Sequence, residues 1–224
     1  MEIAKNLLEL KRGLPPGVKL VAVSKTKPNS DILEAYNAGQ RVFGENKVQE
    51  LAQKYEDLPK DIEWHFIGHP QTNKVKYMAS FVHLIHGVDS LKLMKMINKE
   101  AGKNDRSIKC LLQFHIAEES TKFGLSENEA MEMLDSGEVQ ALQNIEIAGV
   151  MGMATYTDDE NQIRKEFRVL HNIFNTLKKG YFSDSKSFDE ISMGMSDDYQ
   201  LAIEEGSTMI RVGSKIFGER NYQN

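Results

Sequence analysis

The chain has 224 residues, of which 40% are hydrophobic, and its 33 acidic and 28 basic residues give a formal net charge of −5. This length and apolar content exclude a disordered or collagen-like protein and suffice for one α/β domain with a full core. The slight acidic excess argues against nucleic acid as the main partner, because binding to a phosphate backbone usually shows as a basic surplus.

Short β-rich segments alternate with helical patterns along the chain. Strands are expected at residues 19–25, 41–46, 63–68, 82–89, 108–116, 146–154, 189–195 and 208–218. The intervening segments have helical periodicity, and residues 2–12 predict an extra amphipathic helix before the first strand. We expect N-caps at Asn29 or Ser30, Ser90, Ser126 and Ser196, and C-cap glycines at Gly39, Gly102 and Gly180.

Eight strand–helix units predict a parallel sheet with helical crossovers. Eight units within about 200 residues fit a closed (β/α)₈ TIM barrel better than an open, doubly wound sheet. An open dinucleotide-binding sheet would also need a Gly-x-Gly-x-x-Gly turn after its first strand, and "SKTKPNS" has none. The sequence therefore predicts a single α/β barrel domain over residues 1–224, without a second β-rich domain.

The loops after strands seven and eight are the usual phosphate site of such a barrel, at the C-terminal ends of the strands. Here they contain Ser196 and the pair Gly213–Ser214. A glycine lets the backbone approach an anion closely, and the serine hydroxyls can donate hydrogen bonds to it. The alternative is that Ser196 serves only as the N-cap of the helix that follows it.

Two basic side chains are expected near this phosphate site. Lys25 ends the first apolar segment, and Arg211 lies two residues before Gly213 on the same face of its strand. A buried ammonium is unfavourable unless it is paired or used chemically, and a lysine beside a phosphate site fits a phosphorylated aldehyde bound as a Schiff base. Alternatively, Arg211 pairs with a buried carboxylate such as Glu45. Lys27 is the rival Schiff-base lysine, because it shares a face with Lys25.

Six segments resemble motifs of a known family, the pyridoxal 5′-phosphate homeostasis proteins, which are single-domain relatives of the alanine racemase barrel. The segments are "LVAVSKTKP", "FGENKVQE", "WHFIG…QTNK", "ESTKFGL", "SMGMSDD" and "IRVGSKIFG", and they occur in the same order over residues 19–219. The resemblance implies a TIM barrel that holds pyridoxal phosphate on Lys25. The chain departs from the family pattern at Pro70, where leucine is more frequent, and at His115, where asparagine is usual.

The resemblance also implies which residues contact the cofactor. Ser196, Gly213 and Ser214 would bind the phosphate, Arg211 would face the pyridine nitrogen, and Asn46 would lie beside the ring. Met151, near the end of the sixth strand, is expected to contact the cofactor as well. His115 either lines the pocket and tunes ligand entry or is a tolerated core substitution.

The expected activity depends on whether the site can move protons. Racemisation requires an acid or base on each face of the substrate, and in the two-domain racemases a tyrosine from the second domain supplies one of them. Tyr156 is the local candidate for that role. An arginine at the ring nitrogen is too weak an acid to protonate it, which makes the ring a weaker electron sink. No catalytic residue is therefore predicted.

We therefore expect a non-catalytic carrier and buffer that acts in intracellular pyridoxal phosphate (vitamin B6) homeostasis and passes the cofactor to apo-enzymes. A monomer is the expected state. The first alternative is a pyridoxal phosphate-dependent enzyme, such as a slow amino-acid racemase or lyase that uses the same site. The second is a barrel for a sugar phosphate.

Other reactive side chains point to no further site. The apolar neighbours of Cys110, the single cysteine, indicate a buried small side chain in a protein of a reducing compartment. The histidine pairs His65/His69 and His83/His86 could suggest a metal site. No cysteine or carboxylate accompanies either pair at ligand spacing, so no metal is expected. With neither an apolar signal segment nor a run of about 18 apolar residues, we expect a cytoplasmic protein without membrane association.

Overall fold

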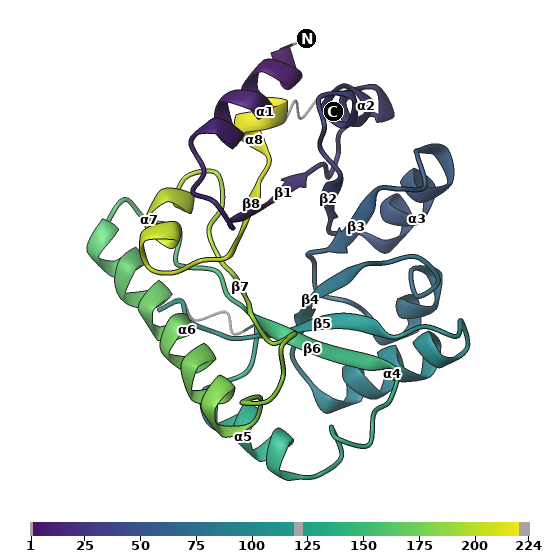
Figure 1. Cartoon of the computed structure of the whole chain (residues 1–224), viewed down its shortest axis with the longest axis vertical. Helices are drawn as coiled ribbons and strands as arrows, with labels where there is room; N and C mark the ends of the chain where they lie inside the picture. The colour runs from purple at the N-terminus through teal and green to yellow at the C-terminus, as the bar shows by residue number, and fades with distance from the viewer. Residues whose placement is uncertain (1, 119–122, 220–224) are drawn as a thin grey trace.

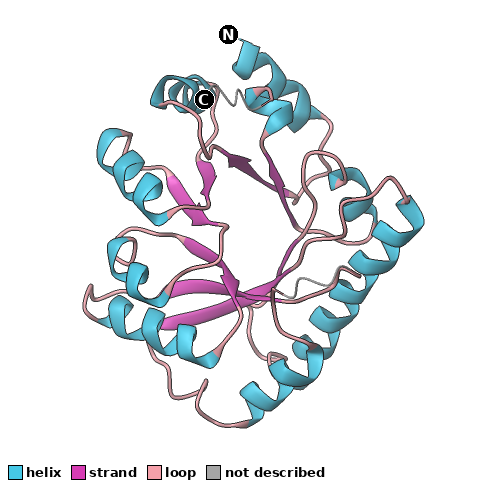
Figure 2. Ribbon diagram, turned by 180° about the vertical axis from the view of Figure 1, so that it is seen from behind, coloured by secondary structure: helices cyan, strands magenta, loops and turns pink. Residues whose placement is uncertain are grey.

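The computed structural model describes residues 2–118 and 123–219. Over these residues, parallel strands β1 to β8 close into a barrel in chain order, with β8 paired to β1. Helices surround the ring of strands, as Figures 1 and 2 show from opposite sides. The TIM barrel predicted from the sequence is thus confirmed.

Each strand overlaps the segment that the sequence predicts for it. The strands are β1 (Lys19–Val23), β2 (Val42–Glu45), β3 (Glu63–Phe66), β4 (Leu84–Val88), β5 (Ile108–Gln113), β6 (Ile145–Met151), β7 (Glu190–Ser192) and β8 (Met209–Val212). Most are shorter than predicted at their C-terminal ends, because the chain leaves the sheet where it reaches the barrel mouth. The prediction for the last segment was wrong after Val212, where the chain turns into a short helix.

The helices include the extra one predicted before β1. They are α1 (Glu2–Arg12), α2 (Asn29–Asn37), α3 (Val48–Asp57), the 3₁₀ helix η1 (Thr72–Tyr77), α4 (Leu91–Gly102), α5 (Glu127–Asp135), α6 (Glu160–Gly180), α7 (Tyr199–Glu204) and α8 (Ser214–Phe217). Helix α1 packs against α2 and α8, near the two strands where the barrel closes (Figure 1). None of the helices formed by the described residues has an apolar stretch long enough to cross a lipid bilayer.

Three of the predicted helix caps are confirmed. The Ser90 hydroxyl accepts a hydrogen bond from the Leu93 N–H, and Ser126 forms a capping box with Glu129. Gly39 follows α2 with φ 90°, a left-handed conformation that glycine adopts without strain.

The other predicted caps were wrong. Pro28 precedes α2, so Asn29 and Ser30 lie inside its first turn. Asp198, and not Ser196, is the N-cap position of α7. Gly102 and Gly180 are the last residues of their helices, and neither has a positive φ.

The apolar core has two layers, which follow from the alternation of side chains along each strand. The inner layer fills the barrel with Val21, Leu84, Leu111, Ala148, Met151 and Met209. The outer layer, between strands and helices, contains large buried side chains such as Phe43, Trp64 and Phe167. Cys110 belongs to this outer layer, and burial raises the pKa of its thiol to about 12, so the structural interpretation of this cysteine is confirmed.

Candidate functional site

A cavity of about 420 Å³ opens at the C-terminal ends of the strands. It brings together six of the seven cofactor-binding residues that the sequence predicts. These are Lys25, Asn46, Ser196, Arg211, Gly213 and Ser214. They follow or belong to β1, β2, β7 and β8, so segments far apart in the sequence meet at one edge of the barrel.

Lys25 reaches the cavity from the turn that follows β1. Val21 belongs to the inner core layer, and Val23, the last residue of the strand, lines the cavity above it by strand alternation. Lys25 lies in the turn of residues 24–27, where the Lys27 N–H donates to the Ser24 carbonyl at 3.0 Å, and it lines the same cavity. The side chain of Lys25 is half-buried there. The Lys25 side chain thus forms part of the cavity wall.

Lys27 also lines the cavity, but its ammonium group has other partners. Its Nζ donates hydrogen bonds to the backbone oxygens of Phe217 at 2.9 Å, Gly218 at 3.2 Å and Glu219 at 3.2 Å. These acceptors match the three donors of an ammonium group, so Lys27 serves to satisfy the carbonyl groups at the end of α8. These contacts give Lys27 a structural role between the end of β1 and the end of α8.

Arg211 is buried in the wall of the cavity, and its partners are neutral. Nη1 donates to Ser192 Oγ at 2.6 Å, and Nη2 donates to the Gly152 carbonyl at 3.2 Å. Burial lowers the pKa of the guanidinium to about 10, while Asp198 acts in the opposite direction, so Arg211 remains charged at neutral pH. The expectation that Glu45 pairs with it was wrong, because Glu45 is bound to Lys54 on the outer side of the barrel.

The two predicted phosphate loops are joined by a hydrogen bond. The Gly213 N–H donates to Ser196 Oγ at 3.3 Å. A Cβ on residue 213 would lie 3.1 Å from the Val23 carbonyl oxygen, so a side chain there would crowd the end of β1. Because Asp198 precedes α7, the alternative that Ser196 is only a helix cap was also wrong.

The structure does not place Met151 at the cavity. Met151 lies in the inner core layer, and Met153, two residues further on, lines the cavity instead. The same step of two leads from Met209 in the inner layer to Arg211 in the cavity wall. The sequence prediction chose Met151 because it is near the end of the sixth strand. This residue lies one layer deeper in the barrel than the residues that line the cavity.

Several cavity-lining residues are not among the cofactor contacts predicted from the sequence. These are Val23, Ile67, Gly68, Met153, Tyr156, Met195, Asp197 and Gly218. Counting in steps of two from the inner layer would have identified Val23 and Met153, whereas the loop residues carry no comparable signal. Tyr156 lies at the rim with 87% of its side chain exposed, and His115 is not among the lining residues. In the "ESTKFGL" motif, residues 119–122 lie outside the described part of the chain.

A chain of buried polar side chains runs from Arg211 into the barrel. Ser192 Oγ, which accepts from Arg211, lies 3.0 Å from His86 Nδ1, and His86 Nε2 lies 3.0 Å from His65 Nδ1. Burial lowers the pKa of His65 to about 3 and holds that of His86 well below its usual value. Both imidazoles are therefore neutral at physiological pH.

A different histidine grouping lies at the opposite end of the barrel. Glu63, His65 and His83 have potential ligand atoms within 4.8 Å of one another, which is a combination the sequence pairs did not include. Burial lowers the pKa of His83, and the charges of Lys109, Arg106 and Lys19 act in the same direction, whereas Glu63 acts to raise it.

Comparisons with known proteins agree with this geometry. The family model described as alanine racemase, N-terminal domain, matches residues 1–221. A pyridoxal phosphate homeostasis protein of Aquifex aeolicus is 40% identical over 205 residues, which are 91% of this chain and 88% of that protein.

Solved structures with the same barrel include PipY of Synechococcus elongatus. Without pyridoxal phosphate its TM-score to this chain is 0.89, and with pyridoxal phosphate bound it is 0.86; in both cases the identity is 37%, over 96% of this chain and 100% of that one. Alanine racemase of Bacillus anthracis, with a TM-score of 0.74 and 16% identity, shares the fold over 99% of this chain and 57% of its own length. The chain therefore belongs to the alanine racemase N-terminal domain family and, within it, to the pyridoxal phosphate homeostasis proteins.

Proposed function

We propose that the protein binds pyridoxal 5′-phosphate as a Schiff base on Lys25 and acts as a carrier and buffer in pyridoxal phosphate homeostasis. The observation that carries this proposal is the convergence of Lys25, Arg211 and the Ser196–Gly213 loops on one cavity. The name of the Aquifex aeolicus relative and the pyridoxal phosphate bound in PipY support it.

The residues of the cavity fit the chemical groups of this cofactor. Ser196, Gly213 and Ser214 would bind the phosphate through hydroxyl and backbone donors, at the place where such barrels usually hold one. Arg211 would donate to the pyridine nitrogen, and Asn46 would lie beside the ring. When bound, the cofactor supplies an aldehyde that condenses with the Lys25 amine.

The same residues support a carrier more than a catalyst. With a pKa of about 10, the Arg211 guanidinium holds its proton at neutral pH, so a pyridine nitrogen facing it stays unprotonated. Without that proton the ring is a poor electron sink for a carbanion. Tyr156, the candidate for a proton-transfer role, lies at the exposed rim. We propose that apo-enzymes receive the cofactor and that the protein acts as a cytoplasmic monomer.

Absorption spectroscopy tests cofactor binding. Adding pyridoxal phosphate to the purified protein should produce a visible band with saturation at one equivalent, and pyridoxal, which lacks the phosphate, should bind more weakly. A protein that shows no such band at any cofactor concentration contradicts the proposal and favours a barrel for a sugar phosphate.

Proton exchange distinguishes the carrier from the enzyme. The cofactor-loaded protein is incubated in D₂O with individual D- and L-amino acids, and the α-proton signal is followed by NMR. The carrier leaves that signal intact for every amino acid over hours. Loss of the signal for any one of them, at a rate above that of free pyridoxal phosphate, would instead establish the racemase or lyase alternative.

A further inference from the structure

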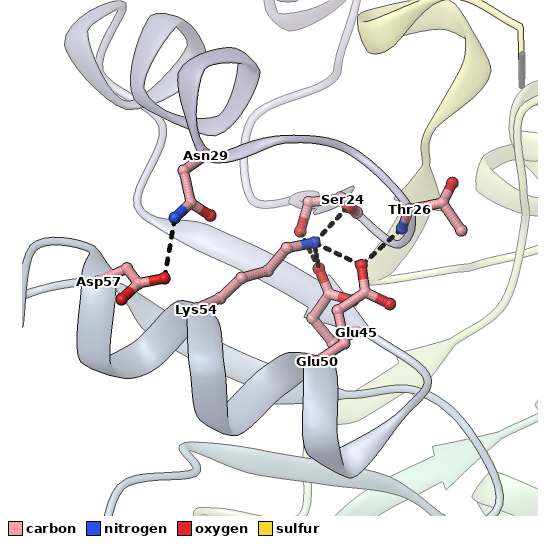
Figure 3. Close-up of polar contacts among 7 residues, drawn as sticks. All are labelled: Ser24, Thr26, Asn29, Glu45, Glu50, Lys54 and Asp57. Carbon is pink, nitrogen blue, oxygen red and sulfur yellow. Dashed lines mark hydrogen bonds and ion pairs between the residues drawn. The ribbon is translucent and has the colours of Figure 1, made fainter.

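A buried ammonium group lies behind β1, outside the barrel. Lys54 of α3 is only 5% exposed, and its Nζ donates hydrogen bonds to the Ser24 carbonyl at 2.8 Å, Glu45 Oε1 at 2.7 Å and Glu50 Oε1 at 2.7 Å (Figure 3). Three acceptors match the three donors of the ammonium group. Lys54 does not line the cavity, so it is not in contact with a ligand there.

Lys54, Glu45 and Glu50 form a cluster whose two carboxylates accept hydrogen bonds from the residues before and after Lys25 in the chain. Glu45 Oε1 accepts from the Ser24 hydroxyl at 2.6 Å, and Glu50 Oε1 accepts from the Thr26 backbone N–H at 2.7 Å (Figure 3). Lys54 bonds to the same two oxygen atoms, and it also bonds to the Ser24 carbonyl. The ammonium group therefore ties the residues before and after Lys25 to one point on α3.

The backbone at this place needs such a restraint. Thr26 has φ 65°, in the left-handed region that is unfavourable for a β-branched residue. Thr26 belongs to the turn that follows β1, directly after Lys25, in which the Lys27 N–H donates to the Ser24 carbonyl at 3.0 Å. The hydrogen bond from the Thr26 N–H to Glu50 is a contact that holds it.

The contacts of this cluster depend on one another because the Glu45 carboxylate is deeply buried. Glu45 is fully buried, and among the described residues its second oxygen, Oε2, has no hydrogen-bond partner. Burial raises the pKa of Glu45, whereas the positive charge of Lys54 acts to lower it. Removing the ammonium group would leave an uncompensated buried carboxylate, so the contacts to Ser24 would rearrange.

We propose that Lys54 is a positioning residue for Lys25. Through Glu45 and Glu50 it fixes the backbone of residues 24–26, so that the Lys25 side chain enters the cavity in the orientation needed for Schiff-base formation. This inference rests on the proposed function, in which the Lys25 amine reacts with an aldehyde.

The test compares two ligands that differ at the reacting group. Pyridoxal 5′-phosphate forms a Schiff base, whereas pyridoxine 5′-phosphate has the same ring and phosphate but an alcohol in place of the aldehyde. In Lys54→Met, the affinity for pyridoxal phosphate is expected to fall by about tenfold to a hundredfold, because a misplaced reacting group loses about that much. The affinity for pyridoxine phosphate should stay within about twofold, since the phosphate loops lie elsewhere on the barrel.

Lys178→Met is the matched control. Lys178 is a half-buried lysine of α6 whose Nζ donates to the Phe188 carbonyl at 2.7 Å, and neither residue lines the cavity. Its loss should leave the affinities for both ligands unchanged. A second variant, Glu50→Ala, removes the acceptor of the Thr26 N–H at a partly exposed position, so it tests the same restraint if Lys54→Met does not fold.

The outcomes separate the two proposals. A selective loss of pyridoxal phosphate affinity in Lys54→Met or in folded Glu50→Ala supports the positioning role. An equal loss for both ligands shows general structural damage and overturns it, as does unchanged affinity for pyridoxal phosphate. If the wild-type protein binds pyridoxine phosphate but forms no Schiff base with pyridoxal phosphate, the proposed function itself fails, and the positioning role fails with it.

Discussion

Lys25 and Lys27 stand two positions apart after β1, and both line the cavity. The sequence predicts a shared face and favours Lys25, because Lys27 lies beyond the apolar segment and beside Pro28, but it does not show the long-range contacts of either lysine. Lys27 is bound to the carbonyl groups at the end of α8, about 190 residues further along the chain, as the separation from Phe217 shows. At the scale of single residues, the structural role of Lys27 is thus set by contacts that its position in the sequence does not reveal.

The serine hydroxyls of the cavity give the first prediction. Ser196→Ala and Ser214→Ala should each weaken pyridoxal phosphate binding by about tenfold, since a hydrogen bond to a charged group contributes about 1.5–3 kcal/mol. Binding of pyridoxal, which has no phosphate, should change little. Titration by absorption measures both ligands, and an equal effect on both would show that these serines do not contact the phosphate.

Met151 shows where residue-scale prediction failed. The register of β5 and β6 shifts between Cys110 and Leu111, so β6 has one extra residue before Met151. The nearby Gly149 lies so close to β7 that a Cβ would be 1.9 Å from the Glu190 carbonyl oxygen. A bulge of this kind changes which residues face inward, and neither the bulge nor the depth of a side chain in the barrel follows from strand periodicity alone.

At the scale of elements, α1 and α8 support the cavity from outside. Helix α8 begins at Ser214, one of the residues that line the cavity, and it packs against α1. The Asn6 side chain donates to the Ile216 carbonyl at 3.3 Å. The amphipathic pattern of residues 2–12 predicted α1 correctly, but it did not indicate that this helix contacts a four-residue helix at the other end of the chain.

Packing of α1 gives the second prediction. Leu7 is fully buried, whereas its neighbour Leu8 is 44% exposed. Leu7→Ala should lower the free energy of unfolding by about 2–5 kcal/mol, the usual effect of truncating a buried leucine. Leu8→Ala should change it by less than about 0.5 kcal/mol. Urea denaturation measures both variants, and equal effects would contradict the packing of α1 described above.

At the scale of the whole molecule, the eight-unit pattern was sufficient to predict the barrel because every repeat carries the same signal. Strands β1 and β8 pair although they are far apart in the sequence, as closure of a parallel barrel requires. The interior polar chain was not predicted. His65 and His86 look like ordinary strand residues, and only the closed barrel shows that they meet inside it.

These buried histidines give the third prediction, for stability against pH. His65 has a pKa of about 3 in the folded protein against 6.5 for an unperturbed histidine, so the unfolded chain binds more protons between these values. Stability should therefore fall as the pH drops below 6.5, by about 1.4 kcal/mol per pH unit for each such histidine. Raised pKa values at Glu45 and Asp198 act with the opposite sign in that range.

A comparison of variants isolates the histidine contribution to this pH dependence. Between pH 6 and pH 4, the free energy of unfolding of His65→Gln should fall less steeply than that of the wild type. The slopes should differ by about 1.4 kcal/mol per pH unit, which corresponds to one proton. Leu7→Ala, which lowers stability without removing a titratable group, is the control and should retain the wild-type slope. Urea titrations at several pH values provide the slopes, and identical slopes for wild type and His65→Gln would show that His65 is protonated in the folded state.

The most direct test of the account is to trap the cofactor on the protein. The purified chain is saturated with pyridoxal phosphate and reduced with borohydride, and the modified residue is located by tandem mass spectrometry. We expect one added pyridoxyl phosphate group on Lys25 and none on Lys25→Ala. Modification of Lys27, of scattered lysines or of none would contradict the assignment of Lys25 as the residue that holds the cofactor.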